Sequence, residues 1–196
     1  MPISEVSICN HALDLLGGDP ILSLDDDTRA GRLCRRNYER CRDAVLRAYP
    51  WNPAIRRAGL PALTEAPLWG FLFQYSLPEG PEPPACLRVL QLEGEIDGRA
   101  RPYRIEGRRL LSNDGPPLNL VYIGRIADPN EFGPLLADAI SARLAAEMSY
   151  ALTGSSALSE AATRSYRDKL AEARAVDAQE GTAEPFAATE WLESRI

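Results

Sequence analysis

The sequence predicts a mixed α+β fold, in which a helical bundle built from both chain ends carries an inserted antiparallel β-domain. Apolar residues recur at helical spacing near both ends of the chain. Between them the spacing changes to the alternation typical of strands, and most of the sixteen prolines lie there. We therefore expect residues 1–50 and 127–180 to form the bundle, residues 51–126 a β-rich domain, and residues 181–196 a C-terminal docking tail.

Two helices are predicted before residue 50. The first covers residues 4–16, where Ser4 is the expected N-cap and a Gly-Gly pair follows the last apolar residue. The second covers residues 29–47, because apolar residues there step by three or four positions: Ala30, Cys34, Tyr38, Cys41, Val45 and Ala48. The three aspartates 25–27 are expected to supply negative charge at its N-terminus, where the helix dipole is positive.

Four β-rich runs are predicted in the middle third, at residues 70–77, 86–95, 101–111 and 118–126. Alternating residues such as Phe71, Phe73 and Tyr75 favour strands with one buried face. Asp-Gly and Asn-Asp-Gly sequences between the runs are turn signals. We therefore expect a small antiparallel sheet or sandwich.

Two more helices are predicted after Pro129. The stripe of the first is Leu136, Ile140, Leu144, Met148 and Ala151, and Gly154 ends it. A serine, Ser155 or Ser156, is expected to cap the second, whose buried face is Leu158, Ala162, Tyr166, Leu170 and Ala173.

The charge balance disfavours a general nucleic-acid binder. The net charge is −6, whereas such proteins usually carry a basic excess. The charge is uneven, however: residues 29–57 hold nine arginines and two acids, and residues 128–196 hold twelve acids and six bases. No apolar run is long enough to span a bilayer and no signal segment opens the chain. We expect a protein of the cytoplasm, or one assembled there.

The motifs expected of an enzyme or a metal protein are missing from the sequence. There is no G-x-S-x-G, no phosphate-binding glycine loop and no H-E-x-x-H. The four cysteines, at positions 9, 34, 41 and 86, form no C-x-x-C, and His11 is the single histidine. We expect buried free thiols, no metal, no cofactor and no catalytic residue. Acidic clusters at residues 25–27 and at Glu93 and Glu95 keep a hydrolase as an alternative.

Four stretches in order resemble a known family. They are ISEVSICNHALDLLGG at 3–18, YERCRDAVLRAYPWNPA at 38–54, FQYSLP with CLRVL at 73–90, and FGPLLADAISARLAAEMSYALTGS at 132–155. Together they are similar to the tail tubular protein A family of tailed bacteriophages, the head-to-tail adaptor (connector) proteins. The resemblance covers about residues 3–176 and does not include the tail.

The resemblance implies a structural virion protein and not an enzyme. Such adaptors form a homo-oligomeric ring, typically a dodecamer, at the head-tail junction. The ring contacts the portal protein on one side and the tail nozzle or stopper protein on the other. Genomic DNA passes through its lumen during ejection without specific binding, and no membrane is involved. The chain would be made in the host cytoplasm and then enter the virion.

Two sets of interaction residues are expected from these considerations. In the ring, the basic helix 29–47 would face the C-terminal helix 156–178 of a neighbour, which is expected to be acidic, with Arg36 and Arg40 at the subunit interface. In the tail, four apolar residues would bind the portal: Phe186, Trp191, Leu192 and Ile196. A virion-associated cell-wall hydrolase and a DNA-packaging accessory protein remain the alternative functions.

Overall fold

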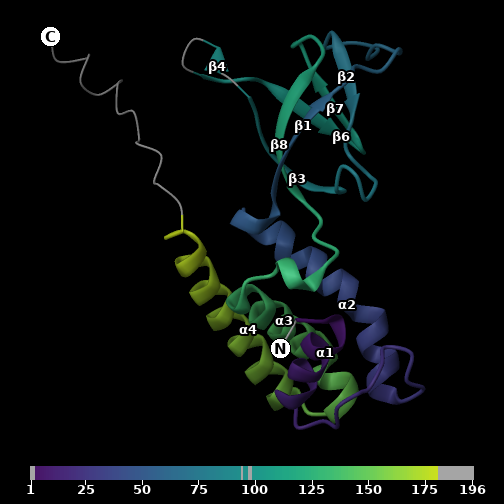
Figure 1. The fold of residues 1–196 in the computed structure, drawn as a ribbon, viewed down its shortest axis with the longest axis vertical. Coiled ribbons are helices and arrows are strands. Elements are labelled where there is room, and N and C mark those ends of the chain that lie inside the picture. Colours follow the sequence, from purple (N-terminus) through teal and green to yellow (C-terminus); the bar gives the residue numbers. More distant parts are fainter. Residues whose placement is uncertain (1–2, 94, 97–98, 181–196) are drawn as a thin grey trace, which may run out of the picture.

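The structure, a computed structural model, describes residues 3–93, 95–96 and 99–180 (Figure 1). Within these ranges the chain forms α-helices and antiparallel sheets, so the predicted α+β class is confirmed. Helices from the two chain ends occupy the lower part of Figure 1, and strands from the middle of the chain occupy the upper part. We call these the helical part and the β part.

The helices of the helical part are α1 (Glu5–Asp14), α2 (Arg29–Ala48), α3 (Pro134–Thr153) and α4 (Ser156–Asp177). Ser4 caps α1 as predicted: its hydroxyl accepts a hydrogen bond from the Ser7 backbone N–H at 3.1 Å. Gly154 ends α3 with φ of 68°, a conformation that glycine adopts without steric cost. Ser155 then caps α4.

The start of α2 differs from the prediction. Its N-cap is Thr28, whose hydroxyl accepts from the Gly31 N–H at 3.0 Å. The aspartates do not cap the helix. Asp25 and Asp27 instead form ion pairs with arginines further along α2, and an Asp26 carboxylate oxygen accepts from the Leu22 backbone N–H at 2.8 Å. The Thr28 hydroxyl, next to the first turn, reaches the free N–H groups more directly than the carboxylates one to three residues earlier.

One hydrophobic cluster joins helices from both ends of the chain. α3 lies in its centre and contacts α1, α2 and α4. The fully buried members include Cys9, Leu13, Cys34, Val45, Ile140, Leu144 and Met148. Of the residues of α4, all of which the structure describes, Ala173 alone is buried, so α4 covers only one side of α3. All four cysteines are buried and free, as predicted.

The β part contains two three-stranded antiparallel sheets and a two-stranded hairpin. The strands are β1 (Ile55–Leu60), β2 (Phe73–Ser76), β3 (Cys86–Leu92), β4 (Glu95–Ile96), β5 (Arg99–Ala100), β6 (Tyr103–Glu106), β7 (Arg109–Ser112) and β8 (Leu118–Gly124). The sheet orders are β1-β8-β3 and β2-β7-β6, and β4 pairs with β5. Tyr75, Leu110, Leu120 and Tyr122 form the centre of a second hydrophobic cluster.

Two details of the β part were not predicted. β1 is a strand although its sequence, IRRAGL, places two arginines and a glycine in it. It pairs along one side with β8 and lies at the edge of its sheet, where arginine side chains reach solvent. Residues 70–72, predicted as the start of a strand, instead belong to an exposed loop, and β2 begins at Phe73.

The β part is joined to the helical part at the C-terminal end of α2. Trp51, just after α2, is buried, and its indole N–H donates to the Val45 carbonyl at 2.9 Å. Ile123 and Ile126, at the end of β8 and beyond, belong to the helical cluster. Two ion pairs cross the same junction: Arg125 with Asp43 at 2.6 Å, and Arg56 with Glu131 at 3.0 Å.

None of the helices that the structure describes has the length and hydropathy needed to cross a bilayer. The four residues predicted to bind the portal, Phe186, Trp191, Leu192 and Ile196, lie outside the described residues.

Candidate interaction surfaces

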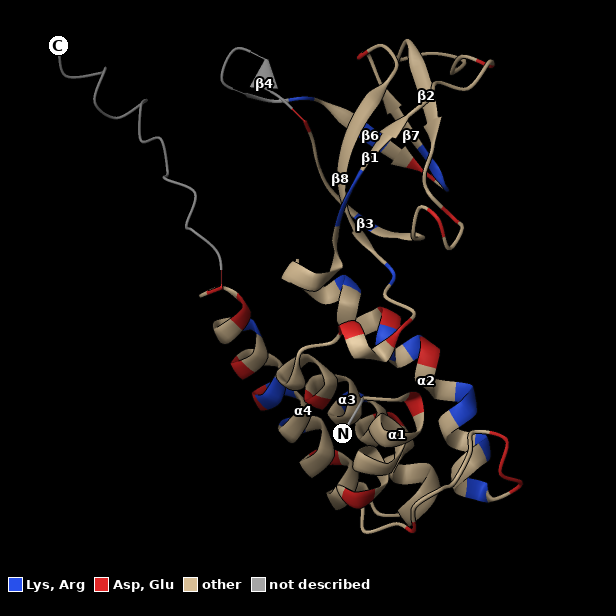
Figure 2. Ribbon diagram, in the orientation of Figure 1, with Lys and Arg blue, Asp and Glu red and all other residues tan. Residues whose placement is uncertain are grey.

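Arginines line the outward face of α2 and give the helical part a cationic face (Figure 2). It consists of Arg29, Arg32, Arg35, Arg36, Arg40 and Arg47, all of which are exposed. The apolar stripe of α2 points the other way, into the helical cluster. The same periodicity that buries the stripe therefore places these arginines together on the surface.

Half of the arginines of this cationic face form ion pairs with described residues of the chain. Arg32 pairs with Asp27, and Arg35 with Asp25 at 3.4 Å. Arg40 reaches Glu147 of α3 at 3.0 Å and also donates to Asn37 at 2.9 Å. Among the described residues, Arg36 makes no ion pair. Of the two predicted interface residues, Arg36 is thus the one left available to a partner, whereas Arg40 also ties α2 to α3.

The charge of α4 does not match the prediction of an acidic partner for α2. Residues 156–178 contain four acids and four bases: Glu160, Asp168, Glu172 and Asp177 against Arg164, Arg167, Lys169 and Arg174. The acidic excess of the C-terminal third comes from residues before and after this helix. Charge complementarity therefore gives no reason to pair α2 with α4 of a neighbour.

A second exposed surface is the apolar loop before β2, which we define as residues 66–72. Three of its side chains face solvent: Leu68 is 90% exposed, Trp69 80% and Leu72 65%. In Figure 1 this blue loop lies at the end of the β part that is farthest from the helices. Contiguous exposed apolar side chains are uncommon on monomers and usually mark an interaction site.

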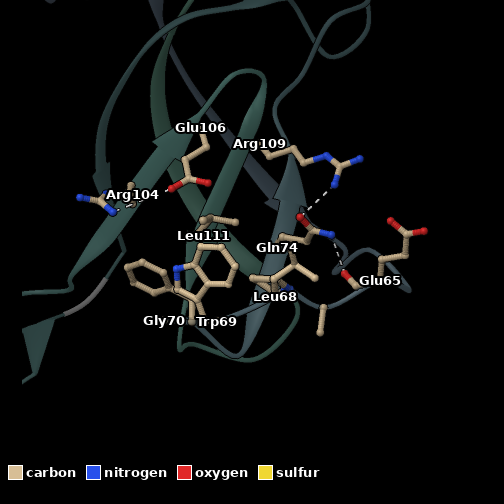
Figure 3. A pocket seen from close by; sticks show the side chains of 12 residues that line it. Glu65, Leu68, Trp69, Gly70, Gln74, Arg104, Glu106, Arg109 and Leu111 are labelled. Carbon is tan, nitrogen blue, oxygen red and sulfur yellow. Dashed lines mark hydrogen bonds and ion pairs between the residues drawn. The ribbon is translucent and has the colours of Figure 1, made fainter.

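The apolar loop encloses a hollow of about 740 Å³ against the outer face of the sheet β2-β7-β6 (Figure 3). Gln74 and Leu111 form its floor and are almost fully buried. The Gln74 side chain donates to the Glu65 carbonyl at 2.7 Å and accepts from Arg109 at 3.1 Å. These hydrogen bonds tie Glu65, just before the loop, to the sheet. Trp69 therefore belongs to a loop whose start is held in place.

The end of this loop, residues 70–72, was predicted from the sequence to be the start of a strand. The segment APLWGFLF is apolar, and an apolar run between turn signals looks like a buried strand. Gly70 adopts φ of 85°, which breaks the extended backbone before β2. The presence of Pro67 and Gly70 within four residues is the sequence signal that favoured a loop.

The residues considered for catalysis or metal binding occupy structural positions. His11 lies 3.4 Å from Asp138, which also lies 3.4 Å from Lys169, so these three polar side chains link α1, α3 and α4. Glu93 is exposed and accepts from Asn119 at 2.6 Å; the side chain of Glu95 is outside the described part. Within the described ranges, no three metal-ligating side chains come together.

A comparison with models of known protein families finds no match, and a search of curated proteins finds no significant relative. The functional assignment therefore depends on the four sequence stretches that resemble the adaptor family and on the two surfaces described above.

Proposed function

We propose that this chain is the subunit of a ring-shaped head-to-tail adaptor in a tailed bacteriophage. The ring would lie between the portal protein and the tail nozzle or stopper protein, and the genome would pass through its lumen. The observation that supports this function best is the presence of two chemically unlike exposed surfaces on one small chain. The cationic face of α2 lies on the helical part, and the apolar loop lies at the far end of the β part.

Unlike surfaces suit a ring that joins two different partners. A cyclic ring of identical subunits uses heterologous contacts, in which one patch meets a different patch on the next copy. Arg36 supplies a charge without an ion pair among the described residues, which an acid of a neighbouring copy can neutralise. The apolar loop lies far from the helices and so remains free for a different protein above or below the ring.

The net charge also suits a channel for DNA. Each contact between a cation and a phosphate releases counterions and adds affinity, so a lumen lined with arginines would hold the genome. A chain with a net charge of −6 avoids this if its cationic face is turned toward a neighbour. We therefore place α2 at the subunit boundary and not at the lumen.

The C-terminal segment 181–196 completes the proposal as the arm that docks on the portal. It contains Phe186, Trp191, Leu192 and Ile196, which is unusually apolar for a terminal segment. One such arm would bind weakly, because fixing the backbone of a peptide segment on binding costs about 1–2 kcal/mol per residue. Repetition around a ring would supply the avidity.

Reversing the charge of Arg36 tests the proposed subunit contact. The Arg36→Glu chain should fold with an unchanged melting temperature, because Arg36 is exposed and makes no ion pair with the described residues. It should fail to enter phage particles, leaving DNA-filled heads without tails. Arg36→Lys keeps the charge and serves as the matched control. Normal tailed particles with Arg36→Glu would contradict the placement of α2 at the subunit boundary.

A further inference from the structure

An apolar groove with an acidic rim lies on the helical part, next to the turn that leads from α2 into the β part. It has a volume of about 440 Å³ and runs between the start of α3, the end of α4 and the turn that follows α2. Its apolar lining comes from all three segments and includes Trp51, Pro134, Leu135 and Val176. Val176 is 40% exposed although it is a large apolar residue of a helix, so the groove is open to solvent along α4.

The groove is already formed in the single chain. Asp177 closes its end, because its carboxylate accepts from the Asn52 backbone N–H at 3.2 and 3.3 Å. The Asn52 side-chain amide in turn donates a hydrogen bond to the Asp177 backbone carbonyl at 2.8 Å. These bonds join the end of α4 to the turn after α2, and Leu136 at the floor is only 4% exposed. The groove is therefore preformed, and a ligand would spend no binding free energy on ordering its walls.

The charged groups that line the groove are all acids. They are Glu131, Asp177 and Glu180, and no arginine or lysine is among the lining residues. Glu131 pairs with Arg56, but Asp177 and Glu180 form no ion pair with a described residue. Burial raises the pKa of Asp177, and the nearby Glu180 charge raises it further. A cation at this rim would relieve both effects.

From this apolar floor and the two rim acids, Asp177 and Glu180, that form no ion pair with a described residue, we propose that the groove binds a polypeptide segment of another protein that presents a large apolar side chain flanked by arginine or lysine. The apolar side chain would fill the hollow over Leu136 and Val176, and the flanking cations would lie against Asp177 and Glu180. This inference does not depend on the proposed adaptor function, because it rests on the groove alone.

Two segments of the chain itself fit the groove less well. The C-terminal segment starts next to the groove at Glu180, but residues 181–196 carry three acids and one base. They would bring like charges to the acidic rim, which disfavours binding. The apolar loop 66–72 contains no basic residue, so a second copy could supply the apolar side chain but not the cations.

A short peptide titrated against the full chain tests the proposal. The probe is acetyl-Ala-Arg-Trp-Arg-Ala-amide, and the control probe has glutamate in place of both arginines. Binding is followed by methyl NMR signals of Leu135, Leu136 and Val176. The basic peptide should shift these signals saturably and more weakly as salt rises, whereas the acidic peptide should bind at least about tenfold less tightly.

Two matched variants locate the site. Val176→Lys places a cation in the groove and should abolish binding of the basic peptide. Leu158→Lys is the same kind of change at a residue that is 46% exposed at the other end of α4, and it should leave binding intact. Both variants should fold, because both positions are exposed on the helix surface.

Three results would overturn the proposal. If the acidic peptide binds as tightly as the basic one, the acidic rim does not contribute to binding. If both variants lose binding equally, the peptide does not bind at this groove. If the full chain does not bind the basic peptide but a chain lacking residues 181–196 does, the groove belongs to the chain's own C-terminal segment.

Discussion

The reactivity of single side chains in this protein is set mainly by burial. The four thiols lie in the two hydrophobic clusters, and none forms a disulfide. Burial raises the pKa of Cys41 to about 11, and the nearby Glu147 adds to this effect. The pKa of Cys86 is also raised, again chiefly by burial. Because the thiolate is the reactive form, Cys41 and Cys86 should be inert in the folded chain.

Thiol labelling tests this expectation. At pH 8 a chromophoric disulfide reagent should react with Cys41 and Cys86 very slowly in the native protein and rapidly once the protein is unfolded in guanidinium. The protonated Cys41 thiol favours the folded state below its ordinary pKa of 9.0, and this contribution is lost as the pH rises toward 11. Rapid labelling of Cys41 or Cys86 in the native chain would show that these residues are not buried as described.

Individual elements depend on close contacts that the sequence pattern does not reveal. Gly31, in the first turn of α2, lies against the loop that holds the aspartates. A Cβ atom at this position would lie 2.4 Å from the Asp26 carbonyl oxygen. The helix therefore requires glycine here, although alanine has the higher helix propensity by about 1 kcal/mol.

Gly31→Ala should consequently destabilise the chain. The clash forces the loop or the helix to move, which costs roughly 2–3 kcal/mol and leaves a net loss of about 1–2 kcal/mol after the propensity gain. For a chain of this size we expect the melting temperature to fall by roughly 2–8 °C. Gly133→Ala is the matched control, because a Cβ there meets nothing within 4 Å. A melting temperature that is unchanged or higher in Gly31→Ala would contradict this view of the α2 N-terminus.

Elements with strong local signals could be predicted from the sequence, and those that depend on distant partners could not. The central residues of the α2 and α3 stripes are buried at helical spacing, as periodicity predicts, whereas Ala48 at the end of α2 is exposed. β1 is stabilised by pairing with β8, some sixty residues later. The sequence IRRAGL contains no local signal that predicts this pairing. The exposure of Trp69 and the groove beside Val176 likewise arise from tertiary packing. The sequence did indicate Arg36, because its off-stripe position predicts a surface side chain.

At the scale of the whole molecule, two hydrophobic clusters are joined through one end of α2. Trp51 and the strand end near Ile123 belong to the helical cluster, while Tyr122, one residue earlier, belongs to the cluster of the β part. The ion pair between Arg125 and Asp43 crosses the same junction. This arrangement joins the β part, which carries the apolar loop, to the helical part, which carries the cationic face.

The central proposal is that copies of this chain form a closed ring that joins two different proteins. Electron cryomicroscopy of the chain produced together with the portal protein of the same phage tests it most directly. We predict a ring seated on the portal, with Arg36 of each copy at a subunit boundary and Trp69 on a surface that contacts a different protein. Single copies that neither close into a ring nor bind the portal would contradict the proposal.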